Sequence, residues 1–445
     1  MPVGLRDSMR SRGTATAIAG RWGECTYDEL LQRVEQWRTS VLVGVERGAV
    51  VAFDGDYGPG AISLLLALAL DGHVLVPLSR DVAPHHESFM TLAEAEYWIT
   101  SVESEPELRV TGTSATHDLY GKLRARGNPG LVLFSSGSTG AHKAAVHDFT
   151  KLLRKFSVPR HCYRTVVFLQ LDHIGGINTL LYTLANGGRA VVSDARTPRA
   201  VCKVIAQHRA ELLPTSPTFL NLLLLSEEHL RHDLSSLKLI TYGTEPMPEA
   251  TLNRLVRTFP DVKLLQTYGL SELGILRSQS RGSDSLWVRV GGEGYETKVV
   301  DGRLWIRSES AMMGYLNAPN PFDNEGFFDT GDLVEVDGEW LRFCGRQSEV
   351  INVGGNKVFP AEVESVLLEL PNVADVAVCG ERSPITGQVV TATVRLIEPE
   401  AADVFKQRMR RFCHDRLSPY KVPARVRITD EALYSARFKR RRQAS

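Results

Sequence analysis

The first half of the chain alternates short apolar runs with longer ones of helical length. Residues 49–53 and 74–77 are compact runs with β-branched side chains, a pattern typical of buried strands. Residues 61–70, between them, form an apolar run long enough for a buried helix. Strands that alternate with helices indicate a mostly parallel sheet covered by helices, so the sequence predicts an α/β fold class.

An amphipathic helix is predicted to begin after Thr26. Apolar residues recur at the helical spacing in Leu30, Val34 and Trp37. Thr26 is a suitable N-cap, and Glu29 follows it at the third position, as a capping box requires. Both features favour a helix that starts at residue 27.

Composition limits the class of protein. A chain of 445 residues is long enough for two or three domains, and its 52 basic against 52 acidic residues argue against bulk capture of nucleic acid or membrane. Six widely spaced cysteines without a Cys-x-x-Cys pattern indicate neither a zinc site nor a disulfide framework. The N-terminus lacks the apolar core of a signal peptide, and the run 61–70 is too short to span a bilayer. We therefore expect a cytoplasmic protein.

A glycine- and hydroxyl-rich loop follows the apolar run 131–133. Residues 134–143 read Phe-Ser-Ser-Gly-Ser-Thr-Gly-Ala-His-Lys, so the backbone N–H groups can turn inward around a polyphosphate while Lys143 adds a positive donor. A flexible surface loop is the alternative. The loop is not a Walker A motif, because His142 and Ala144 occupy the places of its second glycine and its Mg²⁺-binding hydroxyl.

Two further glycine turns follow expected strands. Residues 237–242 lead into Gly243-Thr244-Glu245-Pro246, and residues 262–266 lead into Thr267-Tyr268-Gly269-Leu270-Ser271-Glu272. One alternative is that Ser271 or Glu272 caps a following helix. A serine-hydrolase elbow is excluded, because Leu273 stands where its second glycine should be.

Taken together, the motifs resemble those of the adenylate-forming superfamily, which comprises acyl-CoA synthetases, aryl-CoA ligases, adenylation domains of peptide synthetases and luciferases. The loop at 136–143 is similar to its phosphate loop, with His142 and Ala144 in place of a proline and a glycine. Residues 66–77 match a packing motif of the superfamily, and residues 302–306 and 314–316 match its small β-domain. The resemblance covers residues 25–442.

The resemblance implies a nucleotide site. The β- and γ-phosphates would lie against the phosphate loop, formed by Ser135, Ser136, Gly137, Ser138, Thr139, Gly140 and Lys143. Adenine, ribose and the α-phosphate would contact Gly243, Glu245, Pro246, Tyr268, Gly269, Ser271, Asp332 and Arg346. Tyr268 would offer its flat face to adenine and Asp332 would accept both ribose hydroxyls. Glu272 and Thr139 would hold Mg²⁺.

His173 matches the position that gates the acid pocket of the superfamily. A hydrogen-bonded core histidine is the alternative. Ile174 stands where amino-acid-activating relatives carry an aspartate, which disfavours an α-amino acid substrate. The remaining candidate lining residues suggest an apolar acid, aryl or medium alkyl, and are Gly176, Phe219, Gly243, Gly269 and Leu273.

The C-terminal part resembles the superfamily's mobile domain. The resemblance implies a large N-terminal domain over residues 1–345, with helix-covered sheets and a small β subdomain, and a mobile α+β domain over residues 346–445. Ser348 replaces the usual hinge residue, and Gly354 and Gly355 would let a pantetheine arm pass in the thioester-forming state. Lys439 is similar to the catalytic lysine near the end of these chains, while its neighbour Arg440 is expected to be a surface charge.

The expected activity is ATP-dependent activation of a carboxylic acid. The acid would form acyl-AMP with ATP·Mg²⁺, and the thiol of coenzyme A would then take the acyl group. Lys439, Glu272, Lys143 and His173 are the expected catalytic residues. Three alternatives stay open: loading of an acyl-carrier protein phosphopantetheine, a nucleotide-binding homologue without turnover, and a luciferase-like oxygenase. No nucleic-acid partner is expected.

Overall fold

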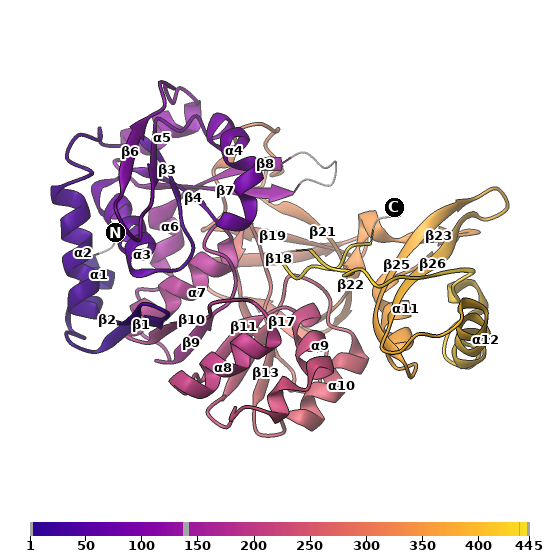
Figure 1. Ribbon diagram of the computed structural model, residues 1–445. Coiled ribbons are helices and arrows are strands. Elements are labelled where there is room, and N and C mark those ends of the chain that lie inside the picture. The colour runs from indigo at the N-terminus through magenta and orange to yellow at the C-terminus, as the bar shows by residue number, and fades with distance from the viewer. Residues whose placement is uncertain (1–2, 137–141, 436, 443–445) are drawn as a thin grey trace.

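The computed structural model describes residues 3–136, 142–435 and 437–442. A large lobe contains two seven-stranded sheets, a six-stranded sheet and a short hairpin, and a small lobe is built on a five-stranded sheet (Figure 1). The α/β fold class expected from the sequence is confirmed.

The first seven-stranded sheet is parallel except at one edge, where β1 and β2 are antiparallel. Its strands, in spatial order, are β13 (Lys263–Gln266), β12 (Leu239–Tyr242), β11 (Leu212–Thr215), β9 (Arg164–Val167), β10 (Arg189–Val192), β1 (Thr16–Gly20) and β2 (Gly23–Thr26). The turns that follow β12 and β13 therefore leave the sheet at the same edge.

The second seven-stranded sheet has a parallel centre and antiparallel edges. Its strands, in spatial order, are β20 (Gly314–Tyr315), β8 (His142–Asp148), β7 (Gly130–Ser136), β4 (Val74–Leu78), β3 (Val50–Asp54), β5 (Tyr97–Thr100) and β6 (Glu107–Val110). Residues 314–316 were expected in the small β-domain. That expectation is wrong for 314–315, because β20 pairs with β8 at the edge of this sheet.

Helices cover both sheets, as the alternating pattern predicted. They are α1 (Val3–Arg10), α2 (Tyr27–Thr39), α3 (Pro59–Asp71), α4 (His86–Leu92), α5 (Asp118–Arg126), α6 (Phe149–Arg154), α7 (Ile174–Ala185), α8 (Pro198–His208), α9 (Pro217–Ser226) and α10 (Glu249–Thr258). The capping box at the start of α2 is present, with both reciprocal hydrogen bonds between Thr26 and Glu29. In the described part of the chain, no helix is long and apolar enough to cross a membrane.

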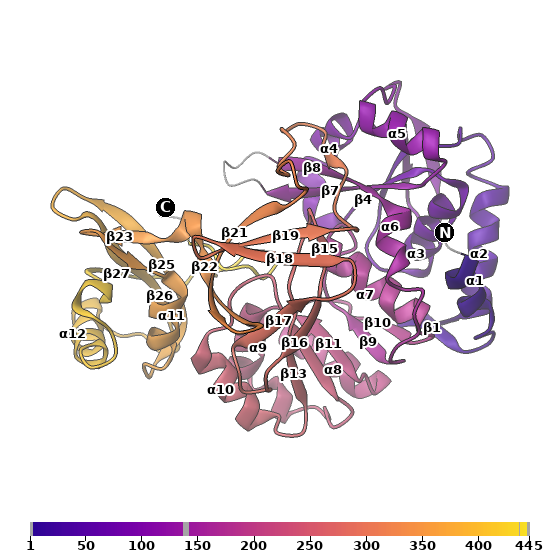
Figure 2. The same cartoon turned by 180° about the vertical axis from the view of Figure 1, so that it is seen from behind.

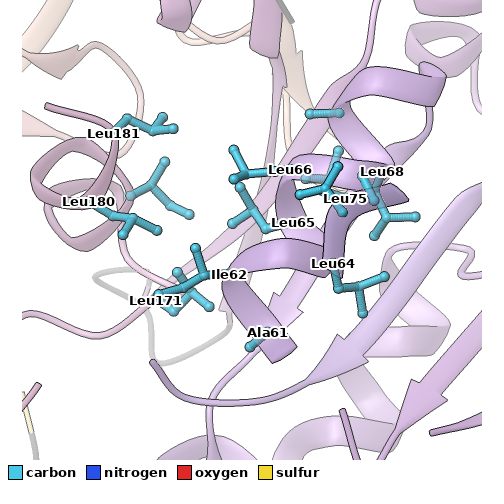
Figure 3. Packing of buried hydrophobic residues seen from close by; sticks show 14 of the residues in the cluster. Ala61, Ile62, Leu64, Leu65, Leu66, Leu68, Leu75, Leu171, Leu180 and Leu181 are labelled. Carbon is cyan, nitrogen blue, oxygen red and sulfur yellow. The ribbon is translucent and has the colours of Figure 1, made fainter. Parts of the chain in front are cut away.

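The largest hydrophobic core lies where α3 meets α7. Eleven of the residues of α3 are buried, so this helix is apolar on all sides. Leu65 and Leu66 of α3 are directed toward Leu180 and Leu181 of α7, all in one cluster of buried residues (Figure 3). This packing fixes α7, whose first turn carries His173 as its N-cap.

The third sheet of the large lobe is antiparallel. It consists of β16 (Arg277–Ser280), β17 (Trp287–Gly291), β22 (Trp340–Arg346), β21 (Phe328–Asp337), β19 (Arg303–Ser308) and β18 (Tyr295–Val300), and the hairpin beside it consists of β14 (Gly269–Leu270) and β15 (Gly274–Ile275). The register of β21 and β22 places Asp332 opposite Arg346.

The small lobe lies to one side of the large lobe, and the chain enters it after β22 (Figure 2). It contains β23 (Ile351–Val353), β24 (Asn356–Val358), β25 (Val373–Ser383), β26 (Gly387–Leu396), β27 (Arg425–Ile428), α11 (Pro360–Leu368) and α12 (Ala402–Cys413). Among the hydrogen bonds that join its body to the large lobe are one from the Asn221 amide to the carbonyl of Ala374 at 3.1 Å and one from the Ala250 N–H to the Ser365 hydroxyl at 3.4 Å.

The buried position of α3 gives a stability prediction. Leu65→Ala removes a fully buried side chain and should lower the free energy of unfolding by about 2–5 kcal/mol, because a cavity remains in a packed core. Leu230→Ala, at a position that is 73% exposed, is the control and should change it by less than about 0.5 kcal/mol. Urea unfolding of both variants measures the difference, and equal losses would contradict the packing described here.

Candidate active site

The strands β7 and β8 frame the predicted phosphate loop. They form an antiparallel pair in which Ser135 lies opposite Lys143 and Ser136 opposite His142. The predicted phosphate-binding residues Gly137, Ser138, Thr139 and Gly140 lie outside the described residues. The two strands nevertheless fix where the loop leaves and re-enters the sheet.

Tyr315 links the lysine of this loop to the predicted metal ligand. The ammonium of Lys143 lies 5.1 Å from the centre of the Tyr315 ring, and the Tyr315 hydroxyl donates a hydrogen bond of 2.6 Å to Oε1 of Glu272. Burial raises the pKa of Tyr315, and the neighbouring Glu272 carboxylate adds to this shift, so the phenol remains a donor. Sequence reasoning missed Tyr315 because it placed this segment in the small β-domain, away from the nucleotide site.

The predicted ribose residues lie together. The Tyr268 hydroxyl donates to Oδ2 of Asp332 at 2.6 Å, and Nε of Arg346 lies 3.3 Å from Oδ1 of the same carboxylate. Burial raises the pKa of Asp332, and the charge of Arg346 opposes this rise. The Tyr268 ring stacks on Phe343, with 4.6 Å between the ring centres, so one of its faces is already covered.

The two glycine turns meet at the carboxyl ends of β12 and β13. A Cβ atom at Gly243 would lie 2.6 Å from the carbonyl oxygen of Thr267, so only glycine allows this approach. After Gly269 the chain passes through Ser271 and Glu272 into β15, so the alternative in which these two residues cap a helix is wrong.

Glu245 joins three parts of the molecule. Its carboxylate accepts one hydrogen bond from the backbone N–H of Thr218 at the start of α9, at 2.7 Å, and one from the backbone N–H of Arg440, at 3.1 Å. Glu245 therefore connects the turn after β12, which also contains Pro246, to the C-terminal segment. The sequence had placed Glu245 only in the nucleotide site.

His173 lies at the N-terminus of α7, where its Nδ1 accepts the N–H of Gly175 at 3.1 Å. Burial lowers the pKa of His173 well below its usual value, and the charges of Lys439 and Arg437 add to this shift, so the ring is neutral at pH 7. A Cβ atom at Gly176 would lie 1.8 Å from the carbonyl oxygen of Gln170, which explains the glycine at that position.

The C-terminal segment 437–442 brings Lys439 into the large lobe. The carbonyl of Phe438 accepts the Ser216 hydroxyl at 3.0 Å, and the Phe438 ring lies 5.4 Å from those of Phe168 and Phe219. Arg437 donates to the side chain of Gln170 at 3.1 Å. These contacts hold the backbone on either side of Lys439.

The charges of several predicted site residues act on Lys439. Part of its side chain is exposed, yet burial of the ammonium lowers its pKa. Arg346 and Arg437 add to that shift, while Glu245 and Glu272 oppose it. The lysine is therefore within electrostatic range of the predicted metal ligand and of the ribose-site arginine.

Arg440 is not a surface charge, contrary to expectation. Its guanidinium is 4% exposed and pairs with Glu364 at 3.2 Å and with Asp375 at 3.0 Å. Arg442 pairs with the same Glu364 at 2.8 Å and with Glu349 at 2.6 Å. We call these five side chains the tail clamp, because they attach the C-terminal segment to the small lobe.

Gly354 and Gly355 lie apart from the other predicted site residues. They form the turn between β23 and β24, both with positive φ, and a Cβ atom on either would meet nothing within 4 Å. In this arrangement of the lobes the turn is an exposed hairpin tip. Its role in thioester formation stays a prediction.

A cavity of about 790 Å³ opens beside the two glycine turns, and His173, Gly243 and Gly269 line it as expected. The other candidate lining residues do not. Phe219 is fully buried against Phe168 and Phe438, and Leu273 is fully buried in the core of the third sheet. Polar residues absent from the sequence prediction also line the cavity, among them Lys155, Asn178 and Tyr295.

Comparison with known proteins identifies the family. Residues 5–316 match the AMP-binding enzyme family, and residues 362–437 match the AMP-binding enzyme C-terminal domain. The chain therefore belongs to the AMP-binding enzyme family, which confirms the adenylate-forming resemblance.

Similar proteins extend over most of the chain. An indoleacetate–CoA ligase of Aromatoleum aromaticum is 27% identical over 94% of this chain and 91% of its own length. A 4-coumarate–CoA ligase-like protein of Arabidopsis thaliana is 29% identical over 66% of this chain, and the match spans 57% of the plant protein. The solved structure of the anthranilate CoA ligase AuaEII with anthranoyl-AMP has the same fold, with a TM-score of 0.80, 21% identity and coverage of 98% of this chain and 95% of that one.

The tail clamp gives a pH-dependent stability prediction. Burial alone would raise the pKa of Glu364, but the charges of Arg442 and Arg440 outweigh it and lower the pKa to about 2. A carboxyl whose pKa is lower when folded stabilises the protein above its unfolded pKa of about 4.3 and loses this contribution as the pH falls toward 2. Glu364→Gln should therefore lower the free energy of unfolding by about 3–5 kcal/mol at pH 7, because it removes the carboxylate that two buried arginines share and leaves each with one partner.

The control is Glu362→Gln on the same helix. The Glu362 side chain is 42% exposed and pairs with Lys421, so its loss should cost less than about 1 kcal/mol. Urea unfolding between pH 7 and pH 3 measures both variants. The stability of the Glu364 variant should fall less steeply below pH 4.3 than that of the wild type, and parallel curves would contradict the ion pairs.

Proposed function

We propose that this protein is an acid–thiol ligase that activates a carboxylic acid as acyl-AMP and transfers the acyl group to coenzyme A. The position of Lys439 carries the proposal: a lysine attached to the small lobe lies within electrostatic range of Glu272, Arg346 and His173 in the large lobe. The names of the similar proteins, which include CoA ligases and a complex with an acyl-AMP, support the same activity.

In the first half-reaction, a carboxylate oxygen attacks the α-phosphorus of ATP and pyrophosphate leaves. Such a displacement is accelerated by positioning and by neutralising charge, so the protein needs no nucleophile of its own. We assign Lys143 and the phosphate loop to the β- and γ-phosphates, Asp332 to the ribose, and Lys439 to the charge that develops at the α-phosphate.

Glu272 is suited to hold Mg²⁺. Its Oε1 accepts the Tyr315 hydroxyl, which orients the carboxylate. Mg²⁺ usually binds through one or two carboxylates and the substrate phosphates, and no group of three metal-ligating side chains occurs among the residues that the structure describes. Bound there, the ion would neutralise phosphate charge; the other proposed ligand is Thr139.

In the second half-reaction, the thiol attacks the acyl carbonyl and AMP leaves. We infer that the small lobe, beginning near Arg346, rotates between the two steps and brings the turn at Gly354 and Gly355 to the site. Coenzyme A is the proposed acceptor, with an acyl-carrier protein phosphopantetheine as the alternative. The proposed acid has an aryl or medium alkyl body, in keeping with the aromatic acids named for the similar proteins.

Lys439→Ala separates the half-reactions. It should slow adenylate formation by about 10²–10³-fold, the scale for one lost electrostatic donor in an active site. With presynthesised acyl-AMP, the same variant should form thioester at close to the wild-type rate, because Lys439 leaves on the rotating lobe. Pyrophosphate release and thioester formation measure the two steps.

The matched control is Arg441→Ala. Arg441 is exposed, next to the clamp residues but outside them, and its substitution should leave both steps unchanged. Arg440→Ala cannot serve as a control, because Arg440 is buried in the tail clamp. Equal loss in the Lys439 and Arg441 variants, or loss of both steps in the Lys439 variant, would contradict the assignment.

Asp332→Ala should impair both half-reactions, since the ribose contact is used throughout. Loss of a charge-assisted hydrogen bond costs roughly 1.5–3 kcal/mol, so nucleotide affinity should fall by about one to two orders of magnitude. Isothermal titration with AMP measures this without turnover. Wild-type affinity in the variant would show that Asp332 does not hold the ribose.

A further inference from the structure

We propose that the acid activated here carries a second anionic group, and that Lys155 binds this group in the cavity. The inference rests on the proposed function and narrows its substrate class to acids with an apolar body and a second carboxylate. The evidence comes from the position of Lys155, from the groups around it and from the charge of the cavity.

Lys155 directly follows α6 and lines the cavity together with His173 and Gly269. Its ammonium donates a hydrogen bond of 3.1 Å to the backbone carbonyl of Ile275. Ile275 pairs with Gly269 across the β14–β15 hairpin, so their Cα atoms are separated by about 4.5–5.5 Å. The hydrogen bond thus holds the Lys155 ammonium against β15. This strand lies next to Gly269, to which we assign nucleotide and acid contacts.

Other polar groups of the cavity converge on the same carbonyl. The Tyr295 hydroxyl lies 3.2 Å from the oxygen of Ile275 and 3.0 Å from the Ser310 hydroxyl. Asn178, on the first turns of α7, also lines the cavity, and its Oδ1 is buried without a hydrogen-bond partner. An unpaired amide oxygen can accept a hydrogen bond but cannot donate one to an anion, so Asn178 marks this part of the wall as polar, and the anionic group is assigned to Lys155.

No carboxylate of the described residues lies within ion-pair distance of Lys155, whose half-buried side chain places its ammonium against the Ile275 carbonyl and 5.1 Å from the centre of the Phe156 ring. Burial lowers its pKa to about 7, and the nearby charge of Arg160 adds to this shift. An anionic ligand would supply the missing partner and favour the charged lysine.

The charge of the residues that line the cavity also favours an anionic ligand. Its lining contains two acidic residues, Glu293 and Glu309, and seven basic ones, which are Lys151, Arg154, Lys155, Arg160, Lys238, Lys263 and Arg277. Lys238 pairs with Glu211, and Glu293 is 88% exposed and 4.0 Å from Arg277. The excess of positive charge draws anions into the cavity.

Acids matched in length test the proposal. The pairs are octanoate with octanedioate, and 4-methylphenylacetate with 4-carboxyphenylacetate, each measured by pyrophosphate release in wild type, Lys155→Met and Lys155→Arg. The wild type should prefer at least one dicarboxylate over its monocarboxylate partner. In Lys155→Met, kcat/KM for that dicarboxylate should fall by about 10–100-fold, the scale of one charge-assisted bond, while the monocarboxylate changes little.

Lys155→Arg keeps the charge and should retain most of the preference for dicarboxylates, which a merely structural role of Lys155 would not predict. Lys203→Met, an exposed lysine on α8, is the control and should leave the ratio between the acids unchanged. The thermal midpoint of each variant shows whether it is folded.

Three results would overturn the inference. The first is equal use of both members of every pair by the wild type, and the second is an unchanged ratio in Lys155→Met. The third is a rise in the KM for coenzyme A alone, which would assign Lys155 to the thiol substrate's phosphates. If the wild type releases no pyrophosphate with any acid, the proposed function itself fails, whereas release with monocarboxylates only rejects the second anionic group alone.

Discussion

The geometry of the candidate site depends on a buried ionic cluster around Glu364. One carboxylate on α11 pairs with two guanidiniums of the C-terminal segment, and each guanidinium has a second carboxylate partner, Asp375 for Arg440 and Glu349 for Arg442. Without the cluster these ion pairs would no longer tie residues 440–442 to the small lobe, and the position of Lys439 would depend on the large-lobe contacts of Arg437, Phe438 and the Arg440 N–H. Buried ion pairs add little net stability compared with apolar packing, but they specify a single arrangement. Here that arrangement aligns a lysine from one lobe with carboxylates of the other.

The large lobe supplies a matching set of fixed polar groups. Parallel strands end at one edge of the first sheet, so the turns after β12 and β13 lie side by side, and the glycine at 243 allows them to approach closely. Tyr315 and Tyr268 each donate to a carboxylate, Glu272 and Asp332 respectively. Hydrogen-bonded acceptors of this kind need little reorganisation when a nucleotide binds.

Local patterns predicted most of the fold, because they depend on residues close together in the chain. The capping box at Thr26 and the apolar helix after Gly58 are examples. The motifs also singled out Asp332 and Arg346, which the structure brings together as an ion pair, whereas their role in nucleotide binding stays a prediction. Three features could not be predicted, since each depends on a distant partner. A run of arginines at a chain end is normally solvated, and only the fold brings Arg440 to Glu364. Lys155 donates to a backbone carbonyl, and a side-chain motif contains no information about such a partner. Phe219 packs against Phe438, which is distant in sequence, and does not line the cavity.

Phe438 has a consequence for how long the two lobes stay engaged. Its backbone has φ of +52°, a left-handed conformation that residues other than glycine rarely adopt. The aromatic contacts with Phe168 and Phe219 offset that strain only while the ring remains seated between them. If the small lobe rotates as proposed, the ring must first withdraw and expose this apolar seat to water, at a cost below the roughly 1.5–3 kcal/mol of a fully buried phenylalanine, since Phe438 is partly buried. That cost would add to the barrier between the two poses, so the residence time of the engaged pose would depend on this one aromatic side chain.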